Sequence, residues 1–321
     1  MDLLTRPVKP LYFRYLAACF GSSLITSIYA LVDCIVVGQY EGPDGAAALA
    51  VIMPLWSMFF SLGMLFGVGG AVLMSTARGA GDKERGDQYW TMSFIGACGA
   101  AALLWVALFL FRDELLTLFG ASAQLLPLAR KYVDWVTLAA PLFLIGQLLS
   151  SFLRNDGAPQ KATLAVIVGG VFNIFGDYFF VFTCDMGIAG AGLATALGQV
   201  MAFLILCTHF FSKKCTLRFC KVDRPLATLA RVGVSGAPSF LMDAAVGVLS
   251  TLFNNQIMRY FGSDALAVYG VIANVTMLVQ SCAYGVGNAA QPLLSTNYGG
   301  EKYRRVLQVL RLSIGTAFVL G

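Results

Sequence analysis

The stretch AAALAVIMPLWSMFFSLGMLFGVGGAVLMSTA, residues 46–77, decides the fold because it runs for 32 residues without one charged side chain. A helix needs about 20 apolar residues to cross the hydrocarbon core of a bilayer. Residues 89–111 and 265–300 are equally free of charge. Strands of a membrane barrel would instead show segments of about ten residues with alternating polarity, and the sequence contains no such pattern. The sequence therefore predicts an all-α polytopic membrane protein.

The composition of the 321 residues supports this prediction. Apolar residues make up 58% and charged residues 12%, against about 45–50% and about 25% in soluble domains. These values exclude a soluble globule, a disordered chain and a disulfide-stapled secreted domain. The net charge of +5 does not indicate nucleic-acid binding, because the basic residues separate hydrophobic runs. The eight cysteines and the single histidine, His209, form no zinc motif in the sequence, so we expect no metal centre of that kind.

Uninterrupted apolar runs predict eight complete spans and the start of a ninth. The runs lie near residues 15–39, 46–72, 89–111, 132–153, 162–183, 187–211, 232–258 and 266–292. A ninth run starts near Val306 and is cut off at Gly321. The first run is longer than a signal-peptide core and no small-residue cleavage site follows it, so we interpret it as a retained span.

The distribution of Lys and Arg predicts the orientation of these spans, because cytoplasmic loops are enriched in both residues. With the N-terminus inside, 18 of the 22 basic residues fall in inside segments. The other four are Arg112, Arg130, Lys131 and Arg259. We therefore expect the N-terminus on the inside.

Three short matches indicate an internal repeat. Leu49-Ala50-Val51 recurs at residues 266–268, Gly67-Val68-Gly69 at 285–287, and Gly81-Asp82-Lys83 is matched by Gly300-Glu301-Lys302. Matches in this order predict duplication of a six-span unit, with both copies in the same orientation, and two copies imply roughly 440 residues. We therefore expect a truncated chain, with an N-lobe at residues 1–225 and an incomplete C-lobe at residues 226–321.

Three carboxylates lie deep within the predicted spans, namely Asp33, Asp177 and Asp243. An ionisable group near the bilayer centre costs from about 2.5–3.5 kcal/mol upwards, so it is a functional candidate by default. No Lys or Arg lies equally deep to pair with these acids. Asp243 lies nearer the inside end of its span, and two interpretations stay open for it: a functional role, or a side chain that simply reaches water.

Polar neighbours accompany two of these acids. Asn173 and Asp177 are four residues apart and share one helical face. An amide beside a carboxylate can hydrogen-bond either protonation state, and a carboxylate among neutral oxygens can also hold Na⁺, so such a site can exchange a proton for another cation. Tyr29 lies one turn before Asp33, either as its hydrogen-bond donor or as a packing tyrosine.

Spans seven and eight are unusually polar. Among their side chains, Asn255 and Gln280 either line a water-filled lumen or join helices, and the sequence does not separate these alternatives.

Several motifs along the chain resemble those of one transporter family. They are Asp33, Gly67-Val68-Gly69-Gly70 with residues 79–85, Asn173-Ile174-Phe175-Gly176-Asp177, the glycine-rich segment from Gly187 to Thr195, Gly236-Ala237-Pro238-Ser239, and Gln291-Pro292-Leu293-Leu294-Ser295 with Tyr298-Gly299. With these motifs, the chain resembles the multidrug and toxin extrusion (MATE) family from about Tyr15 to its end. The resemblance is greatest to the bacterial and archaeal branch related to the DNA-damage-inducible F-type proteins.

The resemblance implies a twelve-helix exporter with two six-helix lobes around a central cavity, and not an enzyme. It implies antiport, in which organic cations or other amphipathic drugs leave in exchange for H⁺ or Na⁺. The family's N-lobe cation site matches Asp33, Asn173, Asp177 and Thr195 here, and a tyrosine of that site matches Tyr29.

Further expectations accompany this site. The accessory candidates are Asp243, Asn255 and Gln280. We expect no cofactor besides the coupling ion, no catalytic residue, and no bound metal other than Na⁺ at the N-lobe site. The expected partners are small amphipathic or cationic molecules and the lipid bilayer, and not nucleic acid. We expect a monomer in a bacterial or archaeal cytoplasmic (inner) membrane.

The chain departs from the family in two places. Some members bend span one at a proline, whereas Leu11 to Gly42 contains none. Asp243 stands where related sequences often carry an uncharged amide, so it is a candidate for a second protonatable group.

Two other functions are alternatives to antiport. A flippase for lipid-linked precursors, from the same superfamily, would need basic residues in its cavity to bind a polyanionic headgroup, and none is visible in these spans. An intramembrane prenyltransferase would need paired Asp-rich motifs to hold Mg²⁺ on a pyrophosphate, and only one Asp-bearing motif of this kind occurs. The sequence therefore favours a cation-coupled antiporter.

Overall fold

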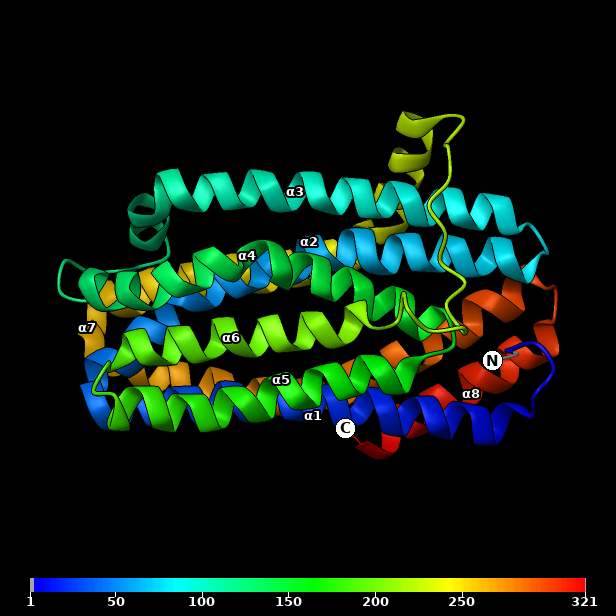
Figure 1. Cartoon of the computed structure of the whole chain (residues 1–321). Helices are drawn as coiled ribbons and strands as arrows, with labels where there is room; N and C mark the ends of the chain where they lie inside the picture. Colours follow the sequence, from blue (N-terminus) through cyan, green and yellow to red (C-terminus); the bar gives the residue numbers. More distant parts are fainter. Residues whose placement is uncertain (1–2, 321) are drawn as a thin grey trace.

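The computed structural model describes residues 3–320, and every regular element in that range is a helix. The elements are α1 (Val8–Glu41), α2 (Pro43–Gly79), α3 (Lys83–Leu118), α4 (Leu126–Asn155), α5 (Pro159–Tyr178), the π-helical turn η1 (Phe179–Thr183), α6 (Ile188–Cys207), α7 (Pro225–Gly299) and α8 (Tyr303–Leu320) (Figure 1). Within the described residues, seven helices are long and apolar enough to cross a membrane, α1 to α7, with η1 continuing α5. The prediction of an all-helical polytopic protein is confirmed.

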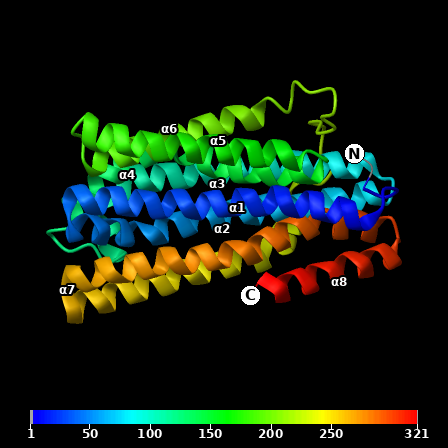
Figure 2. The ribbon, with the colours of Figure 1, turned by 90° about the horizontal axis from the view of Figure 1, so that it is seen from below.

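Helix α7 turns back on itself at its midpoint. It contains 75 residues, and a straight helix of that length would measure roughly 110 Å against a hydrocarbon core of about 30 Å. At Gly262 the backbone has φ 82° and ψ −171°, a conformation open to glycine and not to residues with a Cβ. Figure 2 shows the two arms of α7 side by side, in yellow and orange. The predicted eight spans therefore correspond to seven candidate helices, one of them a hairpin, and the count of eight stays a prediction.

The helices begin at residues that favour helix starts. Pro43, Pro127, Pro159 and Pro225 lie in the first turn of α2, α4, α5 and α7, where proline loses no helical hydrogen bond. The α2–α3, α4–α5 and α6–α7 connections lie at one end of the bundle, toward the right in Figure 1. We call it the basic end, because 11 of the 22 Lys and Arg residues lie in or near these connections and seven more lie in the N-terminal segment or after α7.

Helix α2 packs directly against α7 through glycines that let the two backbones approach. A Cβ at Gly236 would lie 2.0 Å from the carbonyl oxygen of Leu65, and a Cβ at Gly69 would lie 2.5 Å from the carbonyl oxygen of Val232. In lipid no hydrophobic driving force brings helices together. Small residues let them pack closely, and the van der Waals contacts stabilise the crossing. The crossing of α2 and α7 therefore depends on the absence of these side-chain atoms.

Gly236→Ala is expected to destabilise the protein by about 2 kcal/mol, because the added methyl group must push α7 away from the backbone of α2. The matched control is Gly233→Ala on the same helix, where a Cβ would meet no atom within 4 Å. Thermal unfolding of the two detergent-purified variants measures the difference. Equal unfolding midpoints for both variants would show that the close approach contributes nothing.

The basic ends of α2 and α7 pack on one another reciprocally. A Cβ at Gly79 would lie 2.2 Å from the carbonyl oxygen of Thr296, and a Cβ at Gly299 would lie 2.0 Å from the carbonyl oxygen of Thr76. Each helix thus presents a glycine to the same kind of backbone atom on the other. This local two-fold arrangement involves the segments that the sequence matches identified as repeats.

The turns that follow the two helices also correspond, with one shift in register. Asp82 and Lys302 each donate a backbone N–H to the carbonyl oxygen five residues earlier, at 2.9 Å. The residues before them, Gly81 and Glu301, both have positive φ, 90° and 56°. The sequence match paired Gly81 with Gly300, and this pairing is off by one residue, because the left-handed position of the second turn is occupied by Glu301.

A buried ion-pair cluster holds the α6–α7 connection, residues 208–224, against the basic end. The Asp156 carboxylate is 1% exposed. It accepts from Nε2 of His209 at 2.7 Å, from Nη1 of Arg78 at 3.3 Å, and from the backbone N–H of Thr216 at 3.0 Å. The hydroxyl of Thr216 donates to it as well. We call Asp156, His209, Arg78 and Thr216 the loop clasp.

The clasp brings together three groups that can ligate metals, which the sequence spacing did not indicate. Ligand atoms of Asp156, His209 and Cys215 lie within 4.8 Å of one another. Both carboxylate oxygens of Asp156 already accept hydrogen bonds, and burial raises the pKa of the Cys215 thiol above its usual value. A metal ion would have to displace these donors, so we interpret the cluster as an ion-pair clasp.

Candidate functional site

Four helices bring two buried acids into one hydrogen-bonded network. Asp33 on α1 is 8% exposed and Asp177 on α5 is fully buried. The Tyr132 hydroxyl donates to Oδ2 of Asp33 at 2.8 Å and lies 3.1 Å from Oγ1 of Thr195. Nδ2 of Asn173 donates to Oγ1 of Thr195 at 3.0 Å and to Oδ1 of Asp177 at 3.3 Å. We call these five residues the acid-pair network.

The hydroxyl groups of the network donate their hydrogen bonds in one direction, from Thr195 to Tyr132 and from Tyr132 to Asp33. A carboxylate only accepts, so the single hydroxyl proton of Tyr132 goes to Asp33. The Thr195 hydroxyl must then donate to Tyr132, which leaves its oxygen free to accept from the Asn173 amide. The result is a continuous series of hydrogen bonds from Asn173 through Thr195 and Tyr132 to Asp33, while the same amide also donates to Asp177.

Three acceptor oxygens of the network have no hydrogen-bond partner among the described residues. They are Oδ1 of Asp33, Oδ2 of Asp177 and Oδ1 of Asn173, all buried. A buried acceptor without a donor is destabilising by about 1–3 kcal/mol. Oxygen atoms of this kind bind a proton or a hard cation such as Na⁺.

In the part of the chain that the structure describes, the network has no basic partner. Among the ion pairs of residues 3–320, none includes Asp33 or Asp177. Ionised carboxylates in this position are therefore uncompensated by the protein, and a cation or a proton would neutralise them.

Glycines set the helix spacing on which the network depends. A Cβ at Gly192 would lie 2.6 Å from the carbonyl oxygen of Tyr132, so α6 touches α4 beside the tyrosine. Gly169 and Gly198 face one another in the same way. A Cβ added to either residue would lie 2.7 Å from the carbonyl oxygen of the other. The glycine-rich start of α6 therefore allows Thr195 to reach both α4 and α5.

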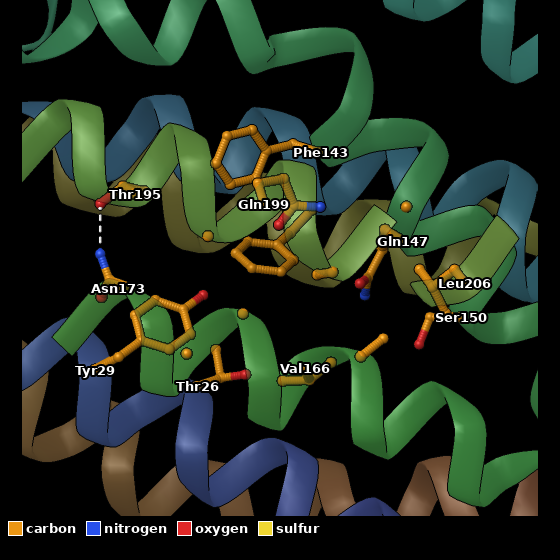
Figure 3. Close-up of a pocket in the computed structure, with 17 residues that line it drawn as sticks. Thr26, Tyr29, Phe143, Gln147, Ser150, Val166, Asn173, Thr195, Gln199 and Leu206 are labelled. Carbon is orange, nitrogen blue, oxygen red and sulfur yellow. Dashed lines mark hydrogen bonds between the residues drawn. The ribbon is translucent and has the colours of Figure 1, made fainter. Parts of the chain in front are cut away.

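A cavity of about 90 Å³ adjoins the network (Figure 3). Polar side chains from α1, α4, α5 and α6 line it together with apolar ones. The polar ones are Thr26, Tyr29, Gln147, Ser150, Asn173, Thr195 and Gln199. A water molecule takes up about 30 Å³ of liquid volume, so the cavity has room for a few waters beside Asn173 and Thr195.

Tyr132, and not the candidate Tyr29, is the tyrosine that donates a hydrogen bond to Asp33. Asp33 accepts its hydrogen bond from Tyr132 on α4, whereas Tyr29 lines the cavity. Tyr132 follows Lys131 near the start of α4, where a tyrosine ordinarily belongs to the interfacial aromatic belt. The sequence therefore held no signal for its contact with Asp33.

Among the described residues, no hydrogen bond joins the accessory candidates to the acid-pair network. Asp243 accepts from the Tyr284 hydroxyl at 2.8 Å, across the two arms of α7. Asn255 donates to the carbonyl oxygens of Leu118 and Thr251, both at 2.9 Å, so it joins α7 to the end of α3. Gln280 has an exposed side chain.

Comparison with known proteins agrees with this fold. The MatE family model matches residues 18–179 and 238–321. The multidrug export protein MepA of Staphylococcus aureus (strain NCTC 8325 / PS 47) is 25% identical over 304 residues, which cover 93% of this chain and 67% of MepA. MepA of Staphylococcus saprophyticus is 25% identical over 302 residues, with the same coverage.

Solved structures share the arrangement of helices. The MATE multidrug transporter DinF-BH, in complex with R6G, superposes with a TM-score of 0.91 at 22% identity, over 100% of this chain and 73% of DinF-BH. The outward-facing conformation of a multidrug resistance MATE family transporter of the MOP superfamily gives 0.86 at 24% identity, over 99% and 71%. The relatives are transporters and not enzymes. With most of its length matched by the family model, the chain belongs to the MatE family of multidrug efflux transporters.

Proposed function

We propose that the protein is a cation-coupled antiporter that exports organic cations in exchange for H⁺ or Na⁺, and that Asp33 and Asp177 hold the coupling ion. The observation that carries this proposal is the pair of buried carboxylates that hydrogen bonds join and that no basic residue in the described chain neutralises. Exchange follows from the charge of the site. Two uncompensated acids are unfavourable when the site is empty, so the site holds either the coupling ion or a positively charged substrate.

The other residues of the network have positioning roles in this proposal. Asn173 and Thr195 supply neutral oxygens around the ion, and Tyr132 holds the Asp33 carboxylate in one orientation. Each elementary charge that moves down a membrane potential of 100 mV supplies about 2.3 kcal/mol for export.

The arrangement of the chain in the membrane is part of the proposal. Counting both arms of α7 gives eight spans, with α8 as the start of a ninth. The N-terminus is placed inside, because 18 of the 22 basic residues then fall in inside segments. Residues 1–225 form the N-lobe that contains the acid-pair network, and residues 226–321 belong to a second lobe. The membrane is a bacterial cytoplasmic (inner) membrane.

Ion-swap transport tests the proposed function. The full-length protein in lipid vesicles is loaded with R6G, a fluorescent organic cation that the DinF-BH structure contains, and a pH or a sodium gradient is imposed. We expect efflux that depends on one of the two gradients and stops when that gradient is collapsed. Movement of pyrophosphate-linked lipids without any gradient-dependent R6G efflux would contradict antiport.

Tyr132→Phe is expected to slow gradient-driven R6G efflux about tenfold, since a hydrogen bond to a charged group contributes roughly 1.5 kcal/mol. The variant keeps the buried ring and removes only the donor to Asp33. Tyr178→Phe is the control, because that side chain is 65% exposed at the end of α5. Equal efflux rates for both variants would remove Tyr132 from the site.

A further inference from the structure

The cavity beside the acid-pair network extends toward the basic end of the bundle. On α6 its lining runs from Thr195 to Leu206, and on α4 from Phe143 to Ser150. Eleven residues of helix rise about 16 Å. Figure 3 shows Asn173 and Thr195 at one end of the cavity and Ser150 and Leu206 at the other. The cavity therefore leads away from the buried acids along the helix axes.

Polar groups recur along this cavity at intervals that suit bound water. Gln199 lies one turn of α6 beyond Thr195, and Gln147 and Ser150 lie on the facing helix α4. Thr26 adds a hydroxyl from α1. Waters in a protein interior make about three hydrogen bonds to such groups, so the cavity can hold a hydrated path and not only a dry packing defect.

A buried arginine lies directly beyond the far end of the cavity. Arg154 is one turn of α4 past Ser150, is 7% exposed, and donates from Nη2 to Oγ of Ser150 at 3.0 Å. Its Nε has no hydrogen-bond partner within residues 3–320. Within residues 3–320, no carboxylate forms an ion pair with it. A buried guanidinium without a counter-charge is destabilising, so this charge needs an explanation other than packing.

The groups around Arg154 leave its charge uncompensated. The Tyr15 hydroxyl donates to the backbone carbonyl oxygen of Arg154 at 3.1 Å and does not face the guanidinium as an acceptor. The Asp156 carboxylate, two residues away, is held in the loop clasp by Arg78 and His209.

We propose that this cavity is the inward route of the coupling ion and that Arg154 is its electrostatic gate, an inference that rests on the proposed antiport. Ions released by Asp33 and Asp177 leave along Asn173, Gln199 and Ser150 toward the basic end. The fixed positive charge of Arg154 opposes cations at the exit, as arginines do in pores that exclude protons and cations. Leak is thereby limited when no substrate has displaced the ion.

Arg154→Gln tests the gate. The full-length protein is reconstituted in vesicles without R6G, and influx is followed with an internal pH dye for H⁺ and with radioactive Na⁺ for sodium. A unit charge about 8 Å from the path, at an effective dielectric constant of about 20, changes the rate at which a cation passes about 30-fold. We expect Arg154→Gln to raise influx of the coupling ion by that factor and Arg154→Lys to leave it unchanged.

A second pair of variants keeps the arginine. Ser150→Asp places a carboxylate beside the guanidinium and neutralises it, so we expect the same leak, whereas Ser150→Asn has equal size and no charge and should not leak. Variants are compared only where they elute as a single species and bind R6G. If ion influx with both Arg154→Gln and Ser150→Asp stayed at the wild-type level, the proposal that Arg154 is the gate would be wrong.

The route is tested separately in the Arg154→Gln background. Val166 lines the cavity and Val171, on the same helix, is 39% exposed. We expect Val166→Phe to stop the leak and Val171→Phe to leave it unchanged. Adding Asp33→Asn should stop it as well, because the ion reaches the cavity from the acid-pair network. A leak that persists with Val166→Phe or with Asp33→Asn would place the path elsewhere.

These outcomes are distinct from failure of the proposed function. Wild-type protein without gradient-driven R6G efflux would refute antiport itself. Wild-type protein that transports R6G, with gate variants that do not leak, would refute the gate alone.

Discussion

Asp33→Asn abolishes gradient-driven R6G efflux, and Asp177→Asn has the same effect, if these acids hold the coupling ion. Asparagine has the size of aspartate, so Tyr132 can still donate to position 33. What is lost is the negative charge, and with it the binding of H⁺ or Na⁺. Without an ion to carry, the ~2.3 kcal/mol per charge that a 100 mV potential supplies is no longer coupled to export.

The control for these variants is Asp134→Asn. The Asp134 side chain is 49% exposed and forms an ion pair with Arg112 at the end of the bundle opposite the basic end. Exposed pairs of this kind contribute about 0–1 kcal/mol, so efflux should be normal. Efflux at the wild-type rate by both Asp33→Asn and Asp177→Asn would refute the assignment of the ion site, whatever the behaviour of the control.

Asp156→Ala destabilises the protein by about 3 kcal/mol, because removal of one member of a buried ion-pair cluster leaves its partners uncompensated. His209 is 1% exposed and would lose its carboxylate partner, and Arg78 would keep one ion-pair partner among the described residues, Asp87 at 2.7 Å. The unfolding midpoint of the detergent-purified variant measures the loss. The same variant should release the α6–α7 connection, so trypsin should cut faster after Lys213 and Lys214.

Asp223→Ala separates this effect from a general change of the connection. Asp223 lies in the same segment, is exposed, and accepts one hydrogen bond from Gln88 at 3.0 Å. We expect wild-type stability and wild-type cleavage for this control. If Asp156→Ala behaved like Asp223→Ala, the clasp would contribute nothing to the fold.

Features that depend on local sequence could be predicted, and most of the helical structure is of this kind. The uncharged run at residues 46–77 lies within α2 because lipid leaves its backbone no other hydrogen-bond partners. The break at Gly262 lies between two predicted spans, residues 232–258 and 266–292. Asp33 and Asp177 could be predicted because a charge deep in a span is expensive, and Asn173 because it shares a helical face with Asp177. Neither argument needs knowledge of tertiary structure.

Features that depend on contacts between distant residues could not be predicted. Tyr132 reaches Asp33 across 99 residues of sequence, and only the packing of α4 beside α1 brings them together. Asp156 and His209 lie near connections, where charged residues are common, so nothing marked them as a buried pair. The positive φ of Glu301 is equally hidden, because the glycine one position earlier is the residue that a sequence comparison selects.

The central claim is that the coupling ion and the exported cation compete for the charge of Asp33 and Asp177. Its most direct test is the binding of R6G to the purified full-length protein, followed by fluorescence anisotropy while H⁺ or Na⁺ is varied. For the wild type, the account predicts that the Kd for R6G rises as the coupling ion is added. For the double variant Asp33→Asn/Asp177→Asn, it predicts a Kd that no longer depends on either ion, and an unchanged ion dependence in that variant would contradict the claim.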